Sequence, residues 1–229
     1  MKKHVTLIVS LFLFYTIATA QTQKGNQLLG GNISFLAASG TSDYSNFNNP
    51  AYNYSNKNKT TSFGIGPVYS YFLADQLDLG VTLNYGTSIT TFNYSAGNPT
   101  LTTLPNKISN QSYIGGVYLR KYFLYKQKAG IRTGPFAEYQ RFKYNNEYLG
   151  PQTNYNNIQS GNSISAGLGL DLVYFPTSRF GIFANLGAVN YTHYTTEYQY
   201  FSDLQSNKAN SFGLRLTTAL NLSLVYSFH

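Results

Sequence analysis

The stretch FGLRLTTALNLSLVYSF, residues 212–228, alternates between apolar and polar side chains at almost every step. One set holds leucines and aromatics, and the other holds glycine, arginine, threonine, asparagine and serine. A period of two indicates a β-strand with one apolar face and one polar face. The apolar set is Phe212, Leu214, Leu216, Thr218, Leu220, Leu222, Leu224, Tyr226 and Phe228.

Seven further segments follow the same design. Three alternate clearly, and four are interrupted by glycine and by Pro67 or Pro135. After Gln21 no apolar run is long enough to span a bilayer as a helix. The clear segments are 77–90, 163–174 and 180–188, and the interrupted ones are about 27–38, 59–73, 109–123 and 129–143.

The connections between these segments alternate strictly in length. The long ones are rich in Asn, Tyr, Ser and Thr and have no periodicity. This order predicts an all-β, eight-stranded, antiparallel up-and-down transmembrane β-barrel with three short periplasmic turns and four long extracellular loops. A sheet in lipid must close, because lipid offers its edges no hydrogen-bond partners. The short connections are 74–76, 124–128 and 176–178, and the long ones are about 39–58, 93–108, 144–160 and 195–209.

The N-terminus has the pattern of an export signal. Lys2 and Lys3 precede an apolar run over 5–18, and Ala18-Thr19-Ala20 offers the small residues that a signal peptidase reads. We expect a signal peptide over 1–20 and a single β-barrel domain over 21–229. The domain would lie in the bacterial outer membrane.

The composition excludes several other classes. The 229 residues include no cysteine, 22 Tyr and 16 Phe, and only 10% are charged. A disulfide scaffold is therefore excluded, and the mean hydropathy of −0.24 does not fit a helical membrane protein. The aromatics crowd the strand ends, which predicts two interfacial bands. Near the turns these are Tyr69, Tyr71, Phe72, Tyr122, Phe123, Tyr125, Tyr174, Phe175, Tyr226 and Phe228.

Six charged residues fall on the polar, lumen-facing side of the strands. Charges in a narrow lumen must be paired or hydrated, so we expect an internal salt-bridge network that joins the arginines to Glu138 and Asp171. Such a network could plug the barrel, or it could line an ion-conducting path. The six are Asp78, Arg120, Arg132, Glu138, Asp171 and Arg215.

A second group of cations lies on or near the loop side. They could contact lipopolysaccharide phosphates, or they could simply solvate the loops. Nucleic-acid binding is not expected, because the basic residues neither cluster nor follow a recognition motif. The six are Lys57, Lys59, Lys107, Arg141, Lys143 and Lys208.

No catalytic, metal or cofactor site is expected. Of three histidines, His4 lies in the expected signal peptide, His229 is the last residue and His193 lies where the seventh strand meets its loop, so no metal site has standard ligand spacing. His193, Thr195 and Glu197 alternate onto one face and could form a base, a nucleophile and an orienting carboxylate. Polar residues at a strand end are ordinary, however, so we expect no enzyme.

On these residues the chain resembles the small eight-stranded outer-membrane barrels, the OmpA-like and OmpX-like porin superfamily. The last strand looks like the insertion signal that the barrel-assembly machinery reads, with Leu222, Leu224, Tyr226 and Phe228 as its apolar side. The resemblance implies biogenesis with periplasmic chaperones and contact with outer-membrane lipid. It also implies a role in envelope integrity, adhesion or binding of an unknown extracellular ligand.

The leading hypothesis is a structural or surface-interaction barrel with a largely plugged lumen. The alternative is a narrow passive channel for ions or small solutes. A third candidate is a soluble secreted β-sandwich that binds sugar through its aromatics.

Overall fold

A computed structural model describes residues 21–44, 54–95, 104–148, 156–200, 203–216 and 222–228. The expected signal peptide over 1–20 lies outside these ranges. Within them, no helix is long and apolar enough to cross a bilayer. The strands are β1 (Gln27–Tyr44), β2 (Tyr54–Ala74), β3 (Leu77–Tyr94), β4 (Pro105–Tyr125), β5 (Ala129–Tyr148), β6 (Asn156–Tyr174), β7 (Phe180–Tyr200), β8 (Asp203–Leu216) and β9 (Leu222–Phe228).

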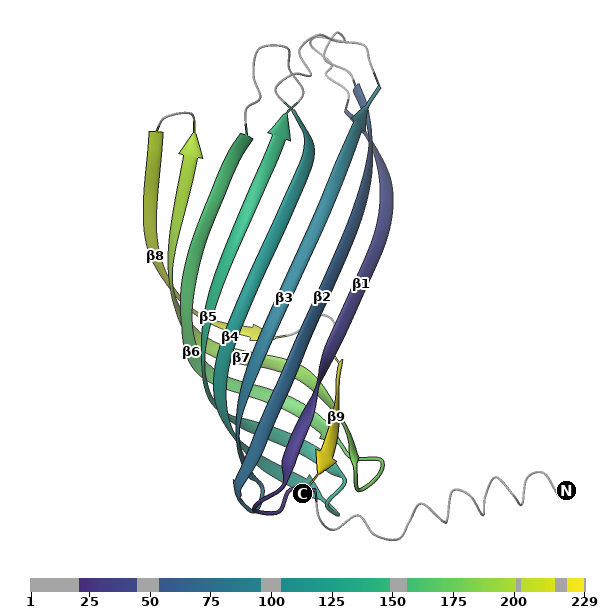
Figure 1. Cartoon of the computed structure of the whole chain (residues 1–229), viewed down its shortest axis with the longest axis vertical. Coiled ribbons are helices and arrows are strands. Elements are labelled where there is room, and N and C mark those ends of the chain that lie inside the picture. The colour runs from purple at the N-terminus through teal and green to yellow at the C-terminus, as the bar shows by residue number, and fades with distance from the viewer. Residues whose placement is uncertain are drawn as a thin grey trace, which may run out of the picture.

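The strands form one antiparallel sheet that closes into a ring (Figure 1). Strands β1 to β7 pair in chain order, and β9 joins β7 to β1. The all-β antiparallel prediction is confirmed, with a ring of hydrogen bonds over eight strands. The expected final strand is instead divided in two. Gly187 pairs with Leu216 and Ala184 with Leu222, so β8 and β9 pair with two separate parts of β7.

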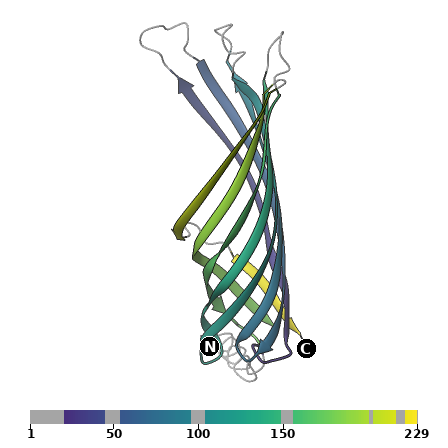
Figure 2. The ribbon, with the colours of Figure 1, turned by 90° about the vertical axis from the view of Figure 1, so that its left-hand side faces the viewer.

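Among the described residues, the ring closes at the end that carries the short turns. There β1 pairs with β9 over Gln27–Gly31. Beyond Gly31, β1 pairs with β2 alone, and β8 pairs with β7 alone. At the opposite end β8 stands apart from β1 (Figures 1 and 2). The described sheet is therefore closed at one end and has a seam between β1 and β8 at the other.

The strands run farther than the alternation predicted. Strands β1 to β7 are 18 to 21 residues long, about twice what a tilted strand needs to cross a bilayer. They extend into all four segments that were expected to be loops. The expected long loop over 195–209 is wrong, because Tyr200 pairs directly with Asp203. Where water contacts both faces of a strand, neither face needs to be apolar, so the sequence does not alternate between apolar and polar side chains.

The short turns have defined backbone chemistry. Between β4 and β5, Lys126 and Gln127 have φ of 48° and 57°, and the N–H of Lys128 donates to the carbonyl of Tyr125 at 3.1 Å. Two consecutive left-handed residues match the twist of a β-hairpin. Between β6 and β7, the hydroxyl of Thr177 accepts from the N–H of Phe180 at 3.1 Å. These turns hold neighbouring strands in register at the closed end.

The outer face of the sheet is apolar. Phe212 and Leu214 of β8 are 76% and 69% exposed, and similar side chains cover the outside of the other strands. In β7 the pattern changes face at a register shift beside Asn185. Val189 and Tyr191 are exposed beyond it, while Ala188 pairs with Arg215 on the polar side. The prediction that Ala188 lies on the apolar outer face is therefore wrong. The register shift beside Asn185 moves every later residue of β7 to the opposite face.

Candidate functional site

The inside of the closed end is filled by an aromatic base. Several aromatics expected in the interfacial band lie here instead: Phe72, Tyr122 and Phe175 are fully buried. Rings from four strands or their ends contact one another at centroid distances of 5.4 to 6.5 Å. A narrow barrel must fill its own interior with side chains. The base consists of Leu28, Phe72, Tyr122, Val173, Phe175, Phe183 and Val225.

The segment that precedes β1 crosses the same end. Gln21, Thr22 and Asn26 are buried. The N–H of Gln76 donates to the carbonyl of Thr22 at 2.6 Å, and the Gln21 amide donates to the carbonyl of Thr177. These bonds tie residues 21–26 to the turns after β2 and β6, beneath the aromatic base.

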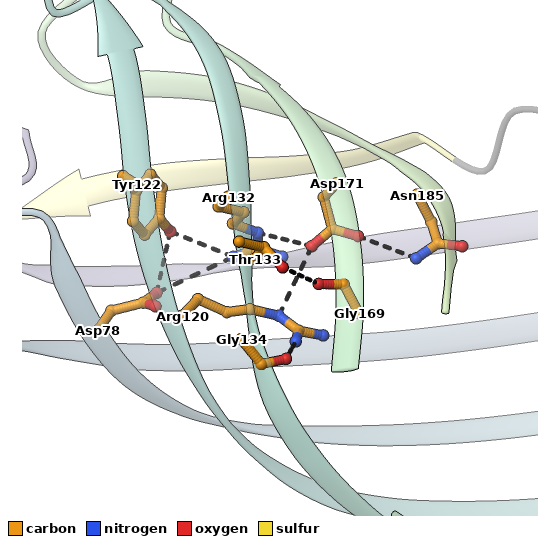
Figure 3. Close-up of polar contacts among 9 residues, drawn as sticks. All are labelled: Asp78, Arg120, Tyr122, Arg132, Thr133, Gly134, Gly169, Asp171 and Asn185. Atoms are coloured by element: carbon orange, nitrogen blue, oxygen red, sulfur yellow. Dashed lines mark hydrogen bonds and ion pairs between the residues drawn. The ribbon is translucent and has the colours of Figure 1, made fainter. Parts of the chain in front are cut away.

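A charged layer lies against the other side of the base. Asp171 on β6 is directly opposite Arg132 on β5. Arg132 Nε donates to Asp171 Oδ2 at 2.8 Å, and Asn185 Nδ2 donates to Asp171 Oδ1 at 2.9 Å (Figure 3). The Arg132 guanidinium carbon lies 4.1 Å from the centre of the Phe183 ring, close enough for a cation–π contact.

The tyrosine of the base joins this layer to a second carboxylate. The Tyr122 hydroxyl donates to Asp78 Oδ2 at 2.9 Å and accepts from Arg132 Nη1 at 3.2 Å. Arg132 Nη1 lies 3.9 Å from Asp78 Oδ2. Five strands, β3 to β7, therefore contribute to one connected network (Figure 3).

The second arginine completes the layer. Arg120 Nε lies 3.9 Å from Asp171 Oδ2, and its Nη1 donates to the carbonyl of Gly134. Two arginines thus face two aspartates, and all four are buried, at 0% to 8% exposure. Buried charges are tolerated when they are paired and hydrogen-bonded. We call Asp78, Arg120, Arg132 and Asp171 the charged layer.

Two of the six predicted lumen charges lie outside this layer. No ion pair within 4.0 Å joins Glu138 or Arg215 to any described residue, so the expected Glu138 bridge does not form there. Glu138 is six residues beyond Arg132 on β5, which places its backbone about 20 Å farther along the strand. Arg215 is exposed on β8, beside the seam. Alternation indicates the side of the strand but not the height in the barrel.

A small chamber lies directly above the charged layer. Its volume is about 180 Å³, and Arg120, Arg132, Asp171 and Glu138 line it together with Thr82 and Asn84. The chamber is polar. It stops at the charged layer, and the aromatic base occupies the barrel below.

The predicted lipopolysaccharide contacts lie on the outside, away from the turns. Five of them are exposed and lie on strands that extend past the closed end: Lys57, Lys59, Arg141, Lys143 and Lys208. Lys107 is partly covered, and its Nζ pairs with Glu147 Oε1 at 2.8 Å. In the register, Arg141 pairs with Tyr113, directly beside the apolar part of the outer face.

The three residues considered for catalysis do not contact one another. His193 Nδ1 lies 2.7 Å from Asn210 Oδ1. No hydrogen bond joins His193 to Thr195 or Glu197 in the described part of the chain. No group of three or more His, Asp or Glu side chains there could hold a metal ion.

The predicted insertion signal forms β9, the strand that closes the ring. Leu222 and Leu224 are exposed on the outer face, and Tyr226 stacks against Phe228 with ring centres 6.5 Å apart. This segment therefore supplies both apolar outer surface and the hydrogen bonds that join β7 to β1.

Comparison with known proteins gives structural likenesses only. No family model matches the chain, and no curated protein matches it. The chain is similar to the N-terminal β-barrel domain of Pseudomonas aeruginosa OprF, at 13% identity and a TM-score of 0.33, over 91% of this chain and 100% of that one. It is also similar to a major outer membrane protein from Thermus thermophilus, at 13% identity and a TM-score of 0.47, over 89% of this chain and 99% of that one.

Proposed function

We propose that this chain is a bacterial outer-membrane β-barrel with a sealed lumen, which acts through its surface rather than as a pore. The aromatic base, the charged layer and residues 21–26 are stacked across one end of the ring. This stack is the observation that carries the proposal. An ion would have to displace buried rings and break a neutralised charge network to pass.

The outer face supports a place in the membrane. Large apolar side chains are exposed around the barrel, far more than a soluble protein leaves in water. Antiparallel strands of this length, closed without a free edge at the turn end, are compatible with lipid. A soluble sugar-binding sandwich would have no reason to expose Leu83, Leu168 and Leu224 to water.

The route to the membrane is part of the proposal. Residues 1–20 would direct export and be removed, and β9 would be the segment that the assembly machinery reads. The turn end would face the periplasm. The opposite end would meet outer-leaflet lipid and extracellular ligands.

A narrow passive channel is the second candidate, because the polar chamber lined by Arg120 and Glu138 could hold water and ions. A channel would need the aromatic base to move aside, whereas a sealed barrel would keep it closed. Proteoliposomes that contain the refolded chain should not swell in arabinose or glycine if the lumen is sealed. Swelling at the rate of a porin control would favour the channel.

A gel assay tests the barrel itself. A folded outer-membrane barrel resists dodecyl sulfate until it is heated, so boiled and unboiled samples should migrate differently. Identical migration, together with failure to partition into detergent, would contradict the membrane proposal.

A further inference from the structure

A hollow on the outer face is lined almost wholly by apolar atoms. It has a volume of about 540 Å³, within the usual range for small-molecule sites. Its walls come from β2, β3, β4 and β5. The lining residues that matter here are Leu83, Tyr85, Tyr113, Gly115, Tyr139 and Arg141, and we call the hollow the tyrosine groove.

The groove exists because one outward position has no side chain. Leu83 pairs with Gly115, and Gly115 pairs with Tyr139, so a glycine lies between two large exposed residues. A Cβ on Gly115 would meet only Leu83 Cδ2, at 3.7 Å. The described part of the barrel therefore does not fill the space above Gly115, and a larger residue would fit there without a clash.

A cation stands at the end of the groove away from the turns. Arg141 is exposed and lies two residues beyond Tyr139 on the same face of β5. No hydrogen bond or ion pair joins its side chain to any described residue. Lys143 follows on the same face, so the positive charge continues outward from the groove.

The aromatic rings place this site at the height of a bilayer interface. The Tyr85 and Tyr113 rings lie 5.1 Å apart at the same end of the groove as Arg141. Tyrosine prefers the level of the lipid headgroups, where its ring is apolar and its hydroxyl is wet. In the proposed membrane location, the apolar groove below this level would face acyl chains, and the Arg141 guanidinium above it would face headgroups.

We propose that the tyrosine groove binds one acyl chain of an anionic lipid, whose phosphate carries no neutralising headgroup cation and pairs with Arg141. A guanidinium can hold a phosphate through two parallel hydrogen bonds. The inference rests on the proposed membrane location. The inference also goes beyond that location. It assigns one binding site and one cation, whereas the sequence suggested six cations without a defined site.

A single tryptophan can report on the site, since the chain contains none. The groove reporter is the variant Tyr139→Trp, and the control reporter is Tyr191→Trp, which changes an exposed tyrosine on the outer face of β7. Each full-length variant is refolded into phosphatidylcholine vesicles with a small fraction of dibrominated phosphatidic acid or dibrominated phosphatidylcholine. Bromine quenches tryptophan on contact, so the ratio of the two quenching efficiencies measures preference for a free anionic phosphate over a phosphate that choline neutralises.

We expect the quenching ratio at the groove reporter to be about fivefold higher than at the control reporter. One cation near the membrane surface enriches an anionic lipid beside it by about this factor. Adding Arg141→Gln or Gly115→Leu should abolish it. Lys208→Gln on β8 and Ala37→Leu on the outer face of β1 make comparable changes at exposed positions that do not line the groove, and they should leave it unchanged.

Three other outcomes overturn the assignment in distinguishable ways. Equal ratios at both reporters would mean that the cations attract phosphate without a site. A preference that survives Arg141→Gln and Gly115→Leu would place the site elsewhere. No quenching of either reporter by either lipid would mean that the chain is not in the bilayer, and the proposed function itself would fail.

Discussion

Arg132 and Asp171 occupy directly opposed positions on β5 and β6, and their side chains meet inside the barrel with Nε and Oδ2 2.8 Å apart. Around this contact Asp171 also accepts from Asn185, and Arg132 also donates to Tyr122. The pair therefore links two halves of the charged layer. Its removal affects more than one bond.

Removing both partners should cost less than the sum of the two single removals. Arg132→Gln or Asp171→Asn alone leaves a buried charge without its partner and should lower the free energy of unfolding by about 3 kcal/mol or more. The double variant should fall short of the sum by at least about 1 kcal/mol. Urea unfolding in lipid vesicles measures each value. Glu138→Gln is the control, and its free energy of unfolding should change by less than about 1 kcal/mol because no ion pair is lost. If the losses of Arg132→Gln and Asp171→Asn simply add in the double variant, the two residues are not paired.

Tyr122→Phe removes only the hydroxyl that bridges Asp78 and Arg132. The buried carboxylate loses a donor, so we expect a loss of about 1–3 kcal/mol. Tyr191→Phe makes the same chemical change on the outer face, where the side chain is exposed, and should stay within about 0.5 kcal/mol. Equal losses in the two variants, measured by urea unfolding, would mean that the bridge contributes nothing.

Gly80→Ala tests the tightness of the lumen beside the charged layer. A Cβ there would contact the Tyr118 ring and lie 2.8 Å from the Ser70 Cβ, so we expect a destabilisation of about 1–3 kcal/mol. At Gly213 on β8 no atom lies within 4 Å of the added Cβ, and Gly213→Ala should be neutral or slightly stabilising. The temperature at which the folded gel band is lost ranks the two variants. The reverse order would contradict this packing.

Strand β8 should exchange its amide hydrogens faster than β9. It pairs with β7 alone, whereas β9 pairs with both β7 and β1. Strands with a free edge open at low cost. Exchange followed by mass spectrometry should show Asp203–Leu216 deuterated before Leu222–Phe228. Equal protection would mean that β8 also pairs with β1 in the membrane.

Much of the fold follows from alternation, but alternation reports only faces. It placed Arg132 and Asp171 on the inside, because polar side chains avoid the lipid side of a strand. It could not give the register between strands, so it could not show that Asp171, and not Glu138, lies beside Arg132. Register depends on turns and cross-strand contacts, which a single strand does not contain.

Two other features were missed although the sequence carries a signal for each. Phe72, Tyr122 and Phe175 lie near strand ends, as interfacial aromatics do, but Tyr122 is two residues from Arg120 and therefore shares its lumen face. The change of face at Asn185 was also missed, since one extra residue inverts every later position of the alternation. Apart from Phe183, the apolar residues of β7 have even numbers up to Ala188 and odd numbers at Val189 and Tyr191, and this switch is the signal of the change of face.

Single-channel current across a planar lipid bilayer tests the sealed lumen most directly. The refolded full chain should insert without producing conductance steps, while a porin refolded in the same way conducts. Insertion is verified independently by protection from added protease. Stable unitary steps in the wild-type chain, with ion preference altered by Arg132→Gln or Asp171→Asn, would contradict the seal and make the charged layer the constriction of a pore.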